Sequence, residues 1–447
     1  MVWLELAVVL AAIFLGSRFG GIGLGLMGMV GVSALVFGFG LPPGGPPGSV
    51  IAIIVAVVTA AAAMQASGGM EYLVMVAGRL LRARPQWITF VAPLVAYLFT
   101  FCAGTGHVAY SILPVIAETA RKAGVRPERP MSISVIASQT AITASPIAAA
   151  TAALIALLEP KGIGLKEILL IAVPATLLGV LAGAASVMKR GRELADDGEA
   201  LARAAASDSA GEAGGAAAAP KALEGAALAR ASRSVLIFLL AAGAIVLFGM
   251  FKQLRPVFPS SKDPESFDLV EMGVIIQLVM YSAAAAIFAF CGAKAAATVR
   301  TPVMTAGLVA VISIVGLGWL GTCFYNGNKA EINAALADTV KAHPWVFSVA
   351  LFGLSVILFS QASTVTTLMP VGIAMGLPAS TLIACFPAVN GYFFLPTYAT
   401  SIAAANFDRT GTTHLGTMVL DHSFMRPGLV TTAVSIVTGF LIAGVVL

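Results

Sequence analysis

The sequence predicts an all-α polytopic membrane protein built from two halves of opposite topology. Of its 447 residues, 59% are hydrophobic and 11% are charged, whereas about 25% of the residues in a soluble domain are charged. Apolar runs of about 20 residues, long enough to cross a hydrocarbon core of about 30 Å as helices, recur along the chain. The third observation is a pattern of polar breaks within apolar segments, which occurs once in each half.

Ten transmembrane helices are predicted from these apolar runs. Two further apolar stretches, 86–120 and 344–375, each carry a polar interruption near the middle. The alternating ten-residue segments of a transmembrane β-barrel are missing from the sequence. The predicted crossings are residues 2–17, 20–40, 50–76, 131–157, 165–188, 233–251, 268–290, 302–322, 381–402 and 427–447.

Positive charge predicts the orientation, because cytoplasmic loops carry the excess of Lys and Arg. Basic residues flank the stretch 86–120 on both sides, so it is expected to be a re-entrant hairpin that opens toward the cytoplasm. This assignment places 19 of the 26 Lys and Arg residues inside and seven outside. Both termini are then periplasmic, and the hairpin 344–375 opens outward. The flanking basic residues are Arg79, Arg82 and Arg84 on one side and Arg121, Lys122, Arg126 and Arg129 on the other.

Each half therefore contains three crossings, a hairpin and two crossings. Five crossings is an odd number, so the second half is inserted upside down, which is the inverted-topology repeat of many secondary transporters. The predicted N-terminal repeat is 1–188 and the C-terminal repeat is 233–447. The segment 189–232 between them is rich in Ala, Gly and charge. It is predicted to be a flexible cytoplasmic linker, with a regulatory docking segment as the alternative.

The polar breaks follow the same spacing in both halves. A proline follows Thr105 and Gln361 at the same distance along the chain. A second break then follows Pro127 in the first half and Pro378 in the second half, again at nearly equal distances. Broken segments in corresponding positions of two halves indicate the binding site of a secondary transporter. Pro kinks and Ser/Thr packing between helices are the alternative explanation for any single residue.

Ser145-Pro146 has the chemistry of a helix start, because serine is a good N-cap and proline suits the first helical position. The crossing 131–157 is therefore expected to stop near Ala144 and to restart at Pro146. Pro396-Thr397 repeats this break in the crossing 381–402.

The returning arms of the two hairpins are expected to be capped by Thr105 and by Ser363 or Thr364. Up to four helix N-termini, each with about half a positive charge, then face one midplane site that suits an anion. Two such clusters related by a pseudo-twofold axis suit a dicarboxylate. The predicted substrate-binding residues are Thr105, Gly106, His107, Thr143, Ser145, Pro146, Gln361, Ser363, Thr364, Asn390, Thr397 and Tyr398.

Other chemistries lack the residues that they need. The sequence offers no catalytic constellation, no metal-ligand spacing and no phosphate loop, and the net charge of +5 needs no nucleic acid to explain it. The glycine-rich run 20–25 follows no strand and has no lysine, so it indicates close helix packing. His107, at the tip of the first hairpin, is expected either to contact or titrate with the substrate or to be a hydrogen-bonded structural group.

Nine blocks of sequence outside the linker carry a resemblance to a known family. They are residues 13–16, 20–23, 63–69, 103–106, 113–118, 141–146, 360–362, 395–398 and 408–413. On these blocks, nearly the whole chain outside the linker resembles the anaerobic C4-dicarboxylate transporter family (Dcu), and it is most similar to the DcuA and DcuB members. One difference is His107, where asparagine or a small polar residue is expected, and it leaves substrate preference and pH response open.

The resemblance implies a carrier of fumarate, succinate, malate and aspartate in the bacterial inner membrane, working by exchange or cation-coupled uptake. It implies no cofactor, and it leaves H⁺ and Na⁺ open as coupling ions. It also implies kinship to the ion-transporter superfamily, whose members often form homodimers and move a transport domain like an elevator. A sensor kinase is a partner of some relatives. The alternatives are transport of another carboxylate or inorganic anion and an anion channel, which would need rings of charge along a pore.

Overall fold

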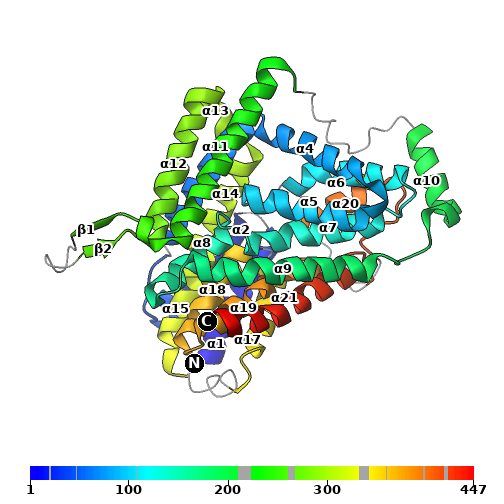
Figure 1. Ribbon diagram of the computed structural model, residues 1–447. Helices are drawn as coiled ribbons and strands as arrows, with labels where there is room; N and C mark the ends of the chain where they lie inside the picture. The colour runs from blue at the N-terminus through cyan, green and yellow to red at the C-terminus, as the bar shows by residue number, and fades with distance from the viewer. Residues whose placement is uncertain are drawn as a thin grey trace.

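The fold consists almost entirely of helices (Figure 1). The computed structural model describes residues 1–19, 22–46, 48–106, 108–209, 223–259, 267–331, 342–358, 360–395, 398–416 and 421–447. Within these residues, seven helical segments are long and apolar enough to cross a membrane. The predicted total of ten crossings and two re-entrant hairpins stays a prediction. The seven segments are Gly48–Ala66, Pro85–Ala103, Leu165–Val187, Gly225–Met250, Met272–Cys291, Pro302–Gly327 and Met425–Val446, and three shorter apolar segments are Val2–Gly16, Gly23–Gly38 and Val346–Leu358.

One set of helices, named the lateral group here, packs together although it comes from both halves of the chain. Helix α3 packs against α12 and α14, α11 packs against α12, and α2 packs against α1 and the π-helix η7. The members of the group are α1 (Val2–Phe19), α2 (Gly23–Ser33), the π-helix η1 (Ala34–Gly38), α3 (Gly48–Ala66), α11 (Gly225–Met250), α12 (Met272–Cys291), α13 (Ala295–Thr298), α14 (Pro302–Ser313), η7 (Ile314–Gly318) and α15 (Trp319–Gly327).

Glycines allow α2 to approach the chain around η7 at backbone distance. A Cβ added at Gly25 would lie 2.2 Å from the carbonyl oxygen of Ile312, and one added at Gly316 would lie 1.9 Å from the carbonyl oxygen of Gly25. Any larger residue would force the two helices apart. The prediction of close helix packing is therefore confirmed at Gly25.

The crossing predicted over 50–76 is wrong in its second part. Helix α3 ends at Ala66, and Gly68 takes a left-handed conformation with φ of +84°. Helix α4 (Gly69–Ala83) then starts as a separate element. It buries an apolar side that includes Leu73 and Ala77, whereas Glu71 and Arg82 remain at least partly exposed. Glycine adopts the left-handed region without the steric cost of a Cβ, so Gly68 marks the end of the crossing.

A second set of helices is named the hairpin group because it contains both interrupted helix pairs. Figure 1 shows its longest members, α9 and α21, side by side. The group consists of η2 (Pro85–Trp87), α5 (Ile88–Ala103), α6 (Val108–Lys122), α7 (Glu128–Thr140), η3 (Ala141–Thr143), α8 (Ala149–Leu158), η4 (Glu159–Lys161), α9 (Leu165–Val187), α17 (Val346–Leu358), α18 (Gln361–Ala374), α19 (Ala379–Cys385), η8 (Phe386–Phe393), α20 (Ala399–Phe407) and α21 (Met425–Val446).

The crossing predicted over 131–157 is interrupted, but it restarts later than expected. Helix α7 ends at Thr140, and α8 begins at Ala149 after an extended Ala148. Ser145 is not the N-cap, because its hydroxyl donates to the carbonyl oxygen of Phe101 in α5 at 2.7 Å. The Ser145 side chain therefore connects the break to α5. The predicted restart of the helix at Pro146 is wrong.

In the crossing predicted over 381–402, η8 ends at Phe393 and α20 begins at Ala399. Pro396 and Thr397 of the predicted break lie outside the described residues.

The first part of the segment 189–232 differs from the expected flexible linker. It forms the short helix η5 (Leu194–Asp196) and α10 (Gly198–Ser209), and Leu194 and Ala200 are buried. Arg203 Nε donates to the carbonyl oxygen of Thr410 at 3.1 Å. The polar composition of the segment gives no signal in the sequence for these few apolar contacts or for the ion pairs that hold the segment against the helical body. Residues 210–222, including the Ala-rich 216–219, lie outside the described residues.

A two-stranded antiparallel hairpin, which the all-α prediction does not include, connects α11 and α12. The 3₁₀ helix η6 (Lys252–Leu254) leads into β1 (Val257–Pro259), which pairs with β2 (Phe267–Leu269). The pair of strands projects from the helical body beside α12 (Figure 1).

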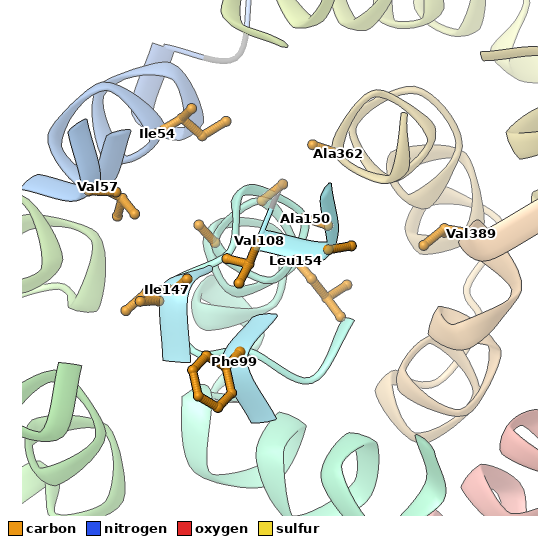
Figure 2. Packing of buried hydrophobic residues seen from close by; sticks show 14 of the residues in the cluster. Ile54, Val57, Phe99, Val108, Ile147, Ala150, Leu154, Ala362 and Val389 are labelled. Carbon is orange, nitrogen blue, oxygen red and sulfur yellow. The ribbon is translucent and has the colours of Figure 1, made fainter. Parts of the chain in front are cut away.

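The main hydrophobic core surrounds α8, where the two helix groups meet. Figure 2 shows Ala150 and Leu154 between residues of α3, such as Ile54, and Ala362 of α18. Helix α8 is therefore covered by apolar side chains from both groups. This packing places the break before α8 at the boundary between the lateral group and the hairpin group.

Candidate functional site

A cavity of about 470 Å³ lies between the two helix groups. One wall comes from α2, α3 and α14 of the lateral group, and Ser313 is the polar residue on this otherwise apolar wall. The opposite wall comes from the hairpin group and carries the other polar side chains. None of the described residues that line the cavity has a charged side chain. The polar wall contains Thr105, Tyr110, Gln139, Ser360, Gln361, Tyr398 and Thr400, with the backbone of Gly104 and Gly106.

The starts of four helices meet at this polar wall. Residues at or next to the first turns of α6, α8, α18 and α20 line the cavity, among them Gly106, Ala149, Gln361 and Thr400. Free backbone N–H groups at a helix start carry partial positive charge and bind anions without a basic side chain. The cavity can therefore attract an anion although no described lining residue is charged.

Three amide side chains join the two halves beside the cavity. Gln361 Nε2 lies 3.2 Å from Gln139 Oε1 and 3.4 Å from Asn390 Oδ1. Asn390 Nδ2 donates to the carbonyl oxygen of Pro387 at 3.0 Å and to Thr143 Oγ1 at 3.4 Å. All four side chains of this amide network (Gln139, Thr143, Gln361 and Asn390) are buried.

Gln139 and Asn390 occupy equivalent positions in the two halves. The spacing from Pro127 to Gln139 is the same as the spacing from Pro378 to Asn390. Gln361 contacts both amides, so it lies where the two repeats meet. The repeated spacing that predicts the breaks therefore also relates the two amides.

The structure sorts the predicted site residues into three sets. Thr105, Gly106, Gln361 and Tyr398 line the cavity. Thr143 and Asn390 lie behind it in the amide network. The remaining described residues do not line the cavity, and His107 and Thr397 lie outside the described residues. The residues away from the cavity are Ser145, Pro146, Ser363 and Thr364.

Ser360, rather than Ser363 or Thr364, caps α18. The backbone N–H of Ser363 donates to Ser360 Oγ at 3.2 Å, which is the geometry of an N-cap. The hydroxyl of Thr364 donates to the carbonyl oxygen of Ser360 at 2.8 Å and is thus used within the helix. The expected caps are therefore wrong by three and four residues, and Ser360 itself lines the cavity.

The sequence did not identify Gln139, Tyr110, Ser360 or Thr400 as site residues. Only Gln139 had a usable signal, its equivalence in spacing to Asn390. The other three lie within one helical turn of a predicted site residue, but only the fold shows that they face the cavity.

Tyr398 is held by a second aromatic ring at the edge of the cavity. Its ring centroid lies 4.7 Å from that of Tyr392. The Tyr392 hydroxyl donates to the carbonyl oxygen of Val135 in α7 at 3.4 Å. Through Tyr392 of η8, these two contacts connect Tyr398, at the start of α20, to the first half of the chain.

Ionic groups gather away from the cavity, near the start of α7. The Glu128 carboxylate is buried and lies 3.0 Å from Arg126 Nε and 3.1 Å from Arg190 Nε. The backbone N–H of Ala200 and the guanidinium of Arg126 lower the pKa of Asp197. Burial lowers the pKa of His422, which precedes α21. Within the described ranges, no group of three His, Cys, Asp or Glu residues is placed to hold a metal ion.

Comparisons with known proteins agree with this architecture. The sequence matches the family described as anaerobic C4-dicarboxylate membrane transporter over residues 1–447. It is 38% identical to the C4-dicarboxylate transporter DcuA of Wolinella succinogenes over the full length of both chains. It is 36% identical to the anaerobic C4-dicarboxylate transporter DcuB of Escherichia coli, with 98% of each chain covered.

The fold also resembles that of a solved transporter of low sequence similarity. The YdaH transporter of Alcanivorax borkumensis superimposes with a TM-score of 0.56 at 13% identity, over 99% of this chain and 96% of that one. The matching family and relatives are membrane transporters and not enzymes. Together with the many apolar helices, these similarities show a multi-pass membrane protein. The chain belongs to the anaerobic C4-dicarboxylate membrane transporter family.

Proposed function

We propose that this protein carries C4-dicarboxylates, namely fumarate, succinate, malate and aspartate, across the bacterial inner membrane. The observation that supports this most is the cavity, whose polar wall combines four helix starts with amide and hydroxyl groups. Such a wall suits carboxylates, because N–H and O–H groups donate to their oxygens. The relatives named C4-dicarboxylate transporters support the same substrate class.

The transport step in this proposal is an elevator-like movement of the hairpin group against the lateral group. Every polar lining residue except Ser313 belongs to the hairpin group, so a bound substrate would travel with that group. The facing wall is apolar and includes the small residues Ala61, Ala306 and Gly307. An apolar wall has few hydrogen bonds to break when the opposite surface slides along it, which supports movement of one group as a unit.

The proposal includes exchange of dicarboxylates or uptake coupled to H⁺ or Na⁺, and function as a homodimer. It also includes an inverted repeat with a cytoplasmic segment 189–232 and two periplasmic termini. The charge asymmetry and the duplicated hairpins of the sequence support this topology. The mass of the purified protein in detergent tests the dimer, and uptake with imposed H⁺ or Na⁺ gradients tests the coupling ion.

Counterflow in proteoliposomes tests the transport proposal. Vesicles loaded with unlabelled succinate should accumulate labelled fumarate or aspartate with saturable kinetics, whereas acetate should exchange poorly. A carrier saturates and shows counterflow, but an anion channel does not. Equal exchange of acetate and succinate, or flux without saturation, would reject the proposed carrier.

A further inference from the structure

The amide network has a direction that two backbone carbonyl groups determine. A carbonyl oxygen only accepts hydrogen bonds. Asn390 Nδ2 lies 3.0 Å from the carbonyl oxygen of Pro387, so the amino side of the Asn390 amide must face that way. Asn390 Oδ1 then faces Gln361.

Thr143 supports this orientation from the other half of the chain. Its hydroxyl donates to the carbonyl oxygen of Thr140 at 2.7 Å, so the hydroxyl oxygen is free to accept from Asn390 Nδ2 at 3.4 Å. Both hydrogens of Asn390 Nδ2 are therefore used. A reversed Asn390 amide would place its oxygen against the carbonyl oxygen of Pro387, which is repulsive.

The fixed Asn390 amide in turn orients the other two amides. Asn390 Oδ1 requires a donor, so Gln361 must present Nε2, and the second hydrogen of Nε2 reaches Gln139 Oε1. Gln139 Nε2 and Gln361 Oε1 then take no part in the hydrogen bonds of the network. Within the described part of the chain, neither atom has a hydrogen-bond partner, and both residues line the cavity. Side chains as buried as these normally satisfy their polar atoms with a protein, water or ligand partner.

The left-over donor of Gln139 lies at the tip of the first hairpin. A Cβ added to Gly106 would lie 2.3 Å from Gln139 Nε2, so the backbone of the tip packs directly on this amide. Gln361, with the left-over acceptor, stands at the start of the second hairpin's returning helix. The donor and the acceptor therefore come from the two interrupted elements that meet at the cavity.

We infer that Gln139 and Gln361 form an oriented donor–acceptor pair that selects dicarboxylates with a hydrogen-bond donor at C2, such as an ammonium or a hydroxyl group. Gln139 Nε2 donates to a substrate carboxylate, and Gln361 Oε1 accepts from the C2 substituent. Asn390 and Thr143 are positioning residues that keep the pair in this orientation. This inference rests on the proposed dicarboxylate transport.

The selectivity follows from the cost of an unpaired acceptor. Succinate offers only C–H groups at C2, so Gln361 Oε1 stays without a partner when succinate binds. Sites built to hydrogen-bond a substrate OH or NH group discriminate strongly against analogues that lack it. The wild-type protein should therefore bind aspartate and malate more tightly than succinate, with a difference in KM of at least about tenfold.

Transport kinetics in proteoliposomes test the inference. For the wild type, Gln361→Met, Thr143→Val and Thr143→Ser, the KM and kcat of succinate, malate and aspartate are measured. The ratio of the succinate KM to the aspartate KM should fall at least fivefold in Gln361→Met and in Thr143→Val. It should be kept in Thr143→Ser, which retains the hydroxyl. Thr366→Val is the matched control, because among the described residues the Thr366 hydroxyl bonds only within α18.

Two outcomes would overturn the inference. One is equal KM values for succinate and aspartate in the wild type, a result that needs no variant to fold. The other is a KM ratio that stays constant in Gln361→Met and Thr143→Val while all KM values change together, as a purely structural role would produce. If the wild type transports no dicarboxylate at all, the proposed function fails instead, and the two failures are thus distinguishable.

Discussion

Glu159 Oε1 lies 2.7 Å from Arg255 Nη1, and the same carboxylate oxygen lies 3.0 Å from the backbone nitrogen of Met272. Glu159 follows α8 in the hairpin group, whereas Arg255 lies in the connection between α11 and α12, and Met272 is the first residue of α12 in the lateral group. One carboxylate thus both pairs with a buried guanidinium and binds the first N–H of α12. This contact joins the two groups that the proposed transport cycle moves relative to each other.

Replacing Glu159 by glutamine should destabilise the protein by about 3–5 kcal/mol, because it leaves a buried charge without its partner. The Arg255 side chain is only 2% exposed, and Glu159 is 23% exposed, so the lower end of this range is expected. Thermal unfolding of the purified protein measures the change.

Lys252→Ala is the matched control for this contact. Lys252 is exposed, and in the described part of the chain it hydrogen-bonds only to the carbonyl oxygen of Gly162, at 3.3 Å, so its loss should cost less than about 1 kcal/mol. A similar unfolding temperature for Glu159→Gln and the wild type would show that the Arg255 pair contributes little to this state.

Gly106→Ala should weaken substrate binding at least about tenfold. The added methyl group would lie 2.3 Å from Gln139 Nε2, so either the amide or the hairpin tip must move. The apparent KM for succinate and aspartate measures the effect. Gly243→Ala in α11 is the control, because a Cβ there has no atom within 4 Å. An unchanged KM in Gly106→Ala would mean that the tip can shift without affecting the site.

The interruptions of the two apolar stretches 86–120 and 344–375 were predictable because their signals are local. The polar interruptions around Thr105 and Gln361 are visible in the sequence. In the structure, α5 and α6 flank the first interruption, and α17 and α18 flank the second. The turn at Gly68 also had a local signal, Ser67-Gly68-Gly69, but the apolar residues on both sides favoured one continuous crossing. Glycines within membrane helices are common, so their presence alone did not predict the turn.

The wrong assignments come from contacts between distant segments. Ser145 looks like an N-cap, yet its hydroxyl binds the carbonyl oxygen of Phe101, 44 residues away. Gln139 lies in the last turn of α7, before the predicted break at Ser145-Pro146, and its partner Gln361 is 222 residues away. Spacing relates equivalent positions of two repeats, but it cannot show which side chains meet in the folded protein.

Asp197→Asn should loosen α10 from the body at neutral pH. The backbone N–H of Ala200 and the guanidinium of Arg126 lower the pKa of Asp197, so both contacts favour the charged carboxylate. Their contribution is complete above the usual Asp range and is lost as the pH falls through the lowered pKa. Docking of the wild type should therefore be constant between about pH 5 and 8 and should weaken below about pH 4.

Hydrogen exchange of the α10 amides measures this docking. Asp196→Asn is the control, because it changes a neighbouring exposed carboxylate that makes no hydrogen bond through its side chain among the described residues. Equal protection of α10 in Asp197→Asn, Asp196→Asn and the wild type would show that burial of Leu194 and Ala200 suffices to hold the segment.

Reporter fusions at Ala210 and after Leu447 should give opposite signals. The proposed inverted repeat places the segment 189–232 in the cytoplasm and both termini in the periplasm, and 19 of 26 basic residues support this orientation. A phosphatase reporter should be active only after Leu447, and a cytoplasmic reporter only at Ala210. Matching signals at the two positions would reject an odd number of crossings in the second half.

His107→Ala should weaken substrate affinity about tenfold to a hundredfold if the imidazole contacts the substrate, since one lost hydrogen bond in a buried site costs about 1–3 kcal/mol. The sequence places His107 between Gly106 and Val108, and Gly106 lines the cavity. His107→Asn should retain much of the activity, because the amide can still donate. The KM of the wild type should change between about pH 6 and 7, and this change should vanish in His107→Asn. An unchanged KM in a folded His107→Ala variant would assign the histidine a structural role, and substrate binding would then depend on the hydroxyl groups, the amides and the helix starts.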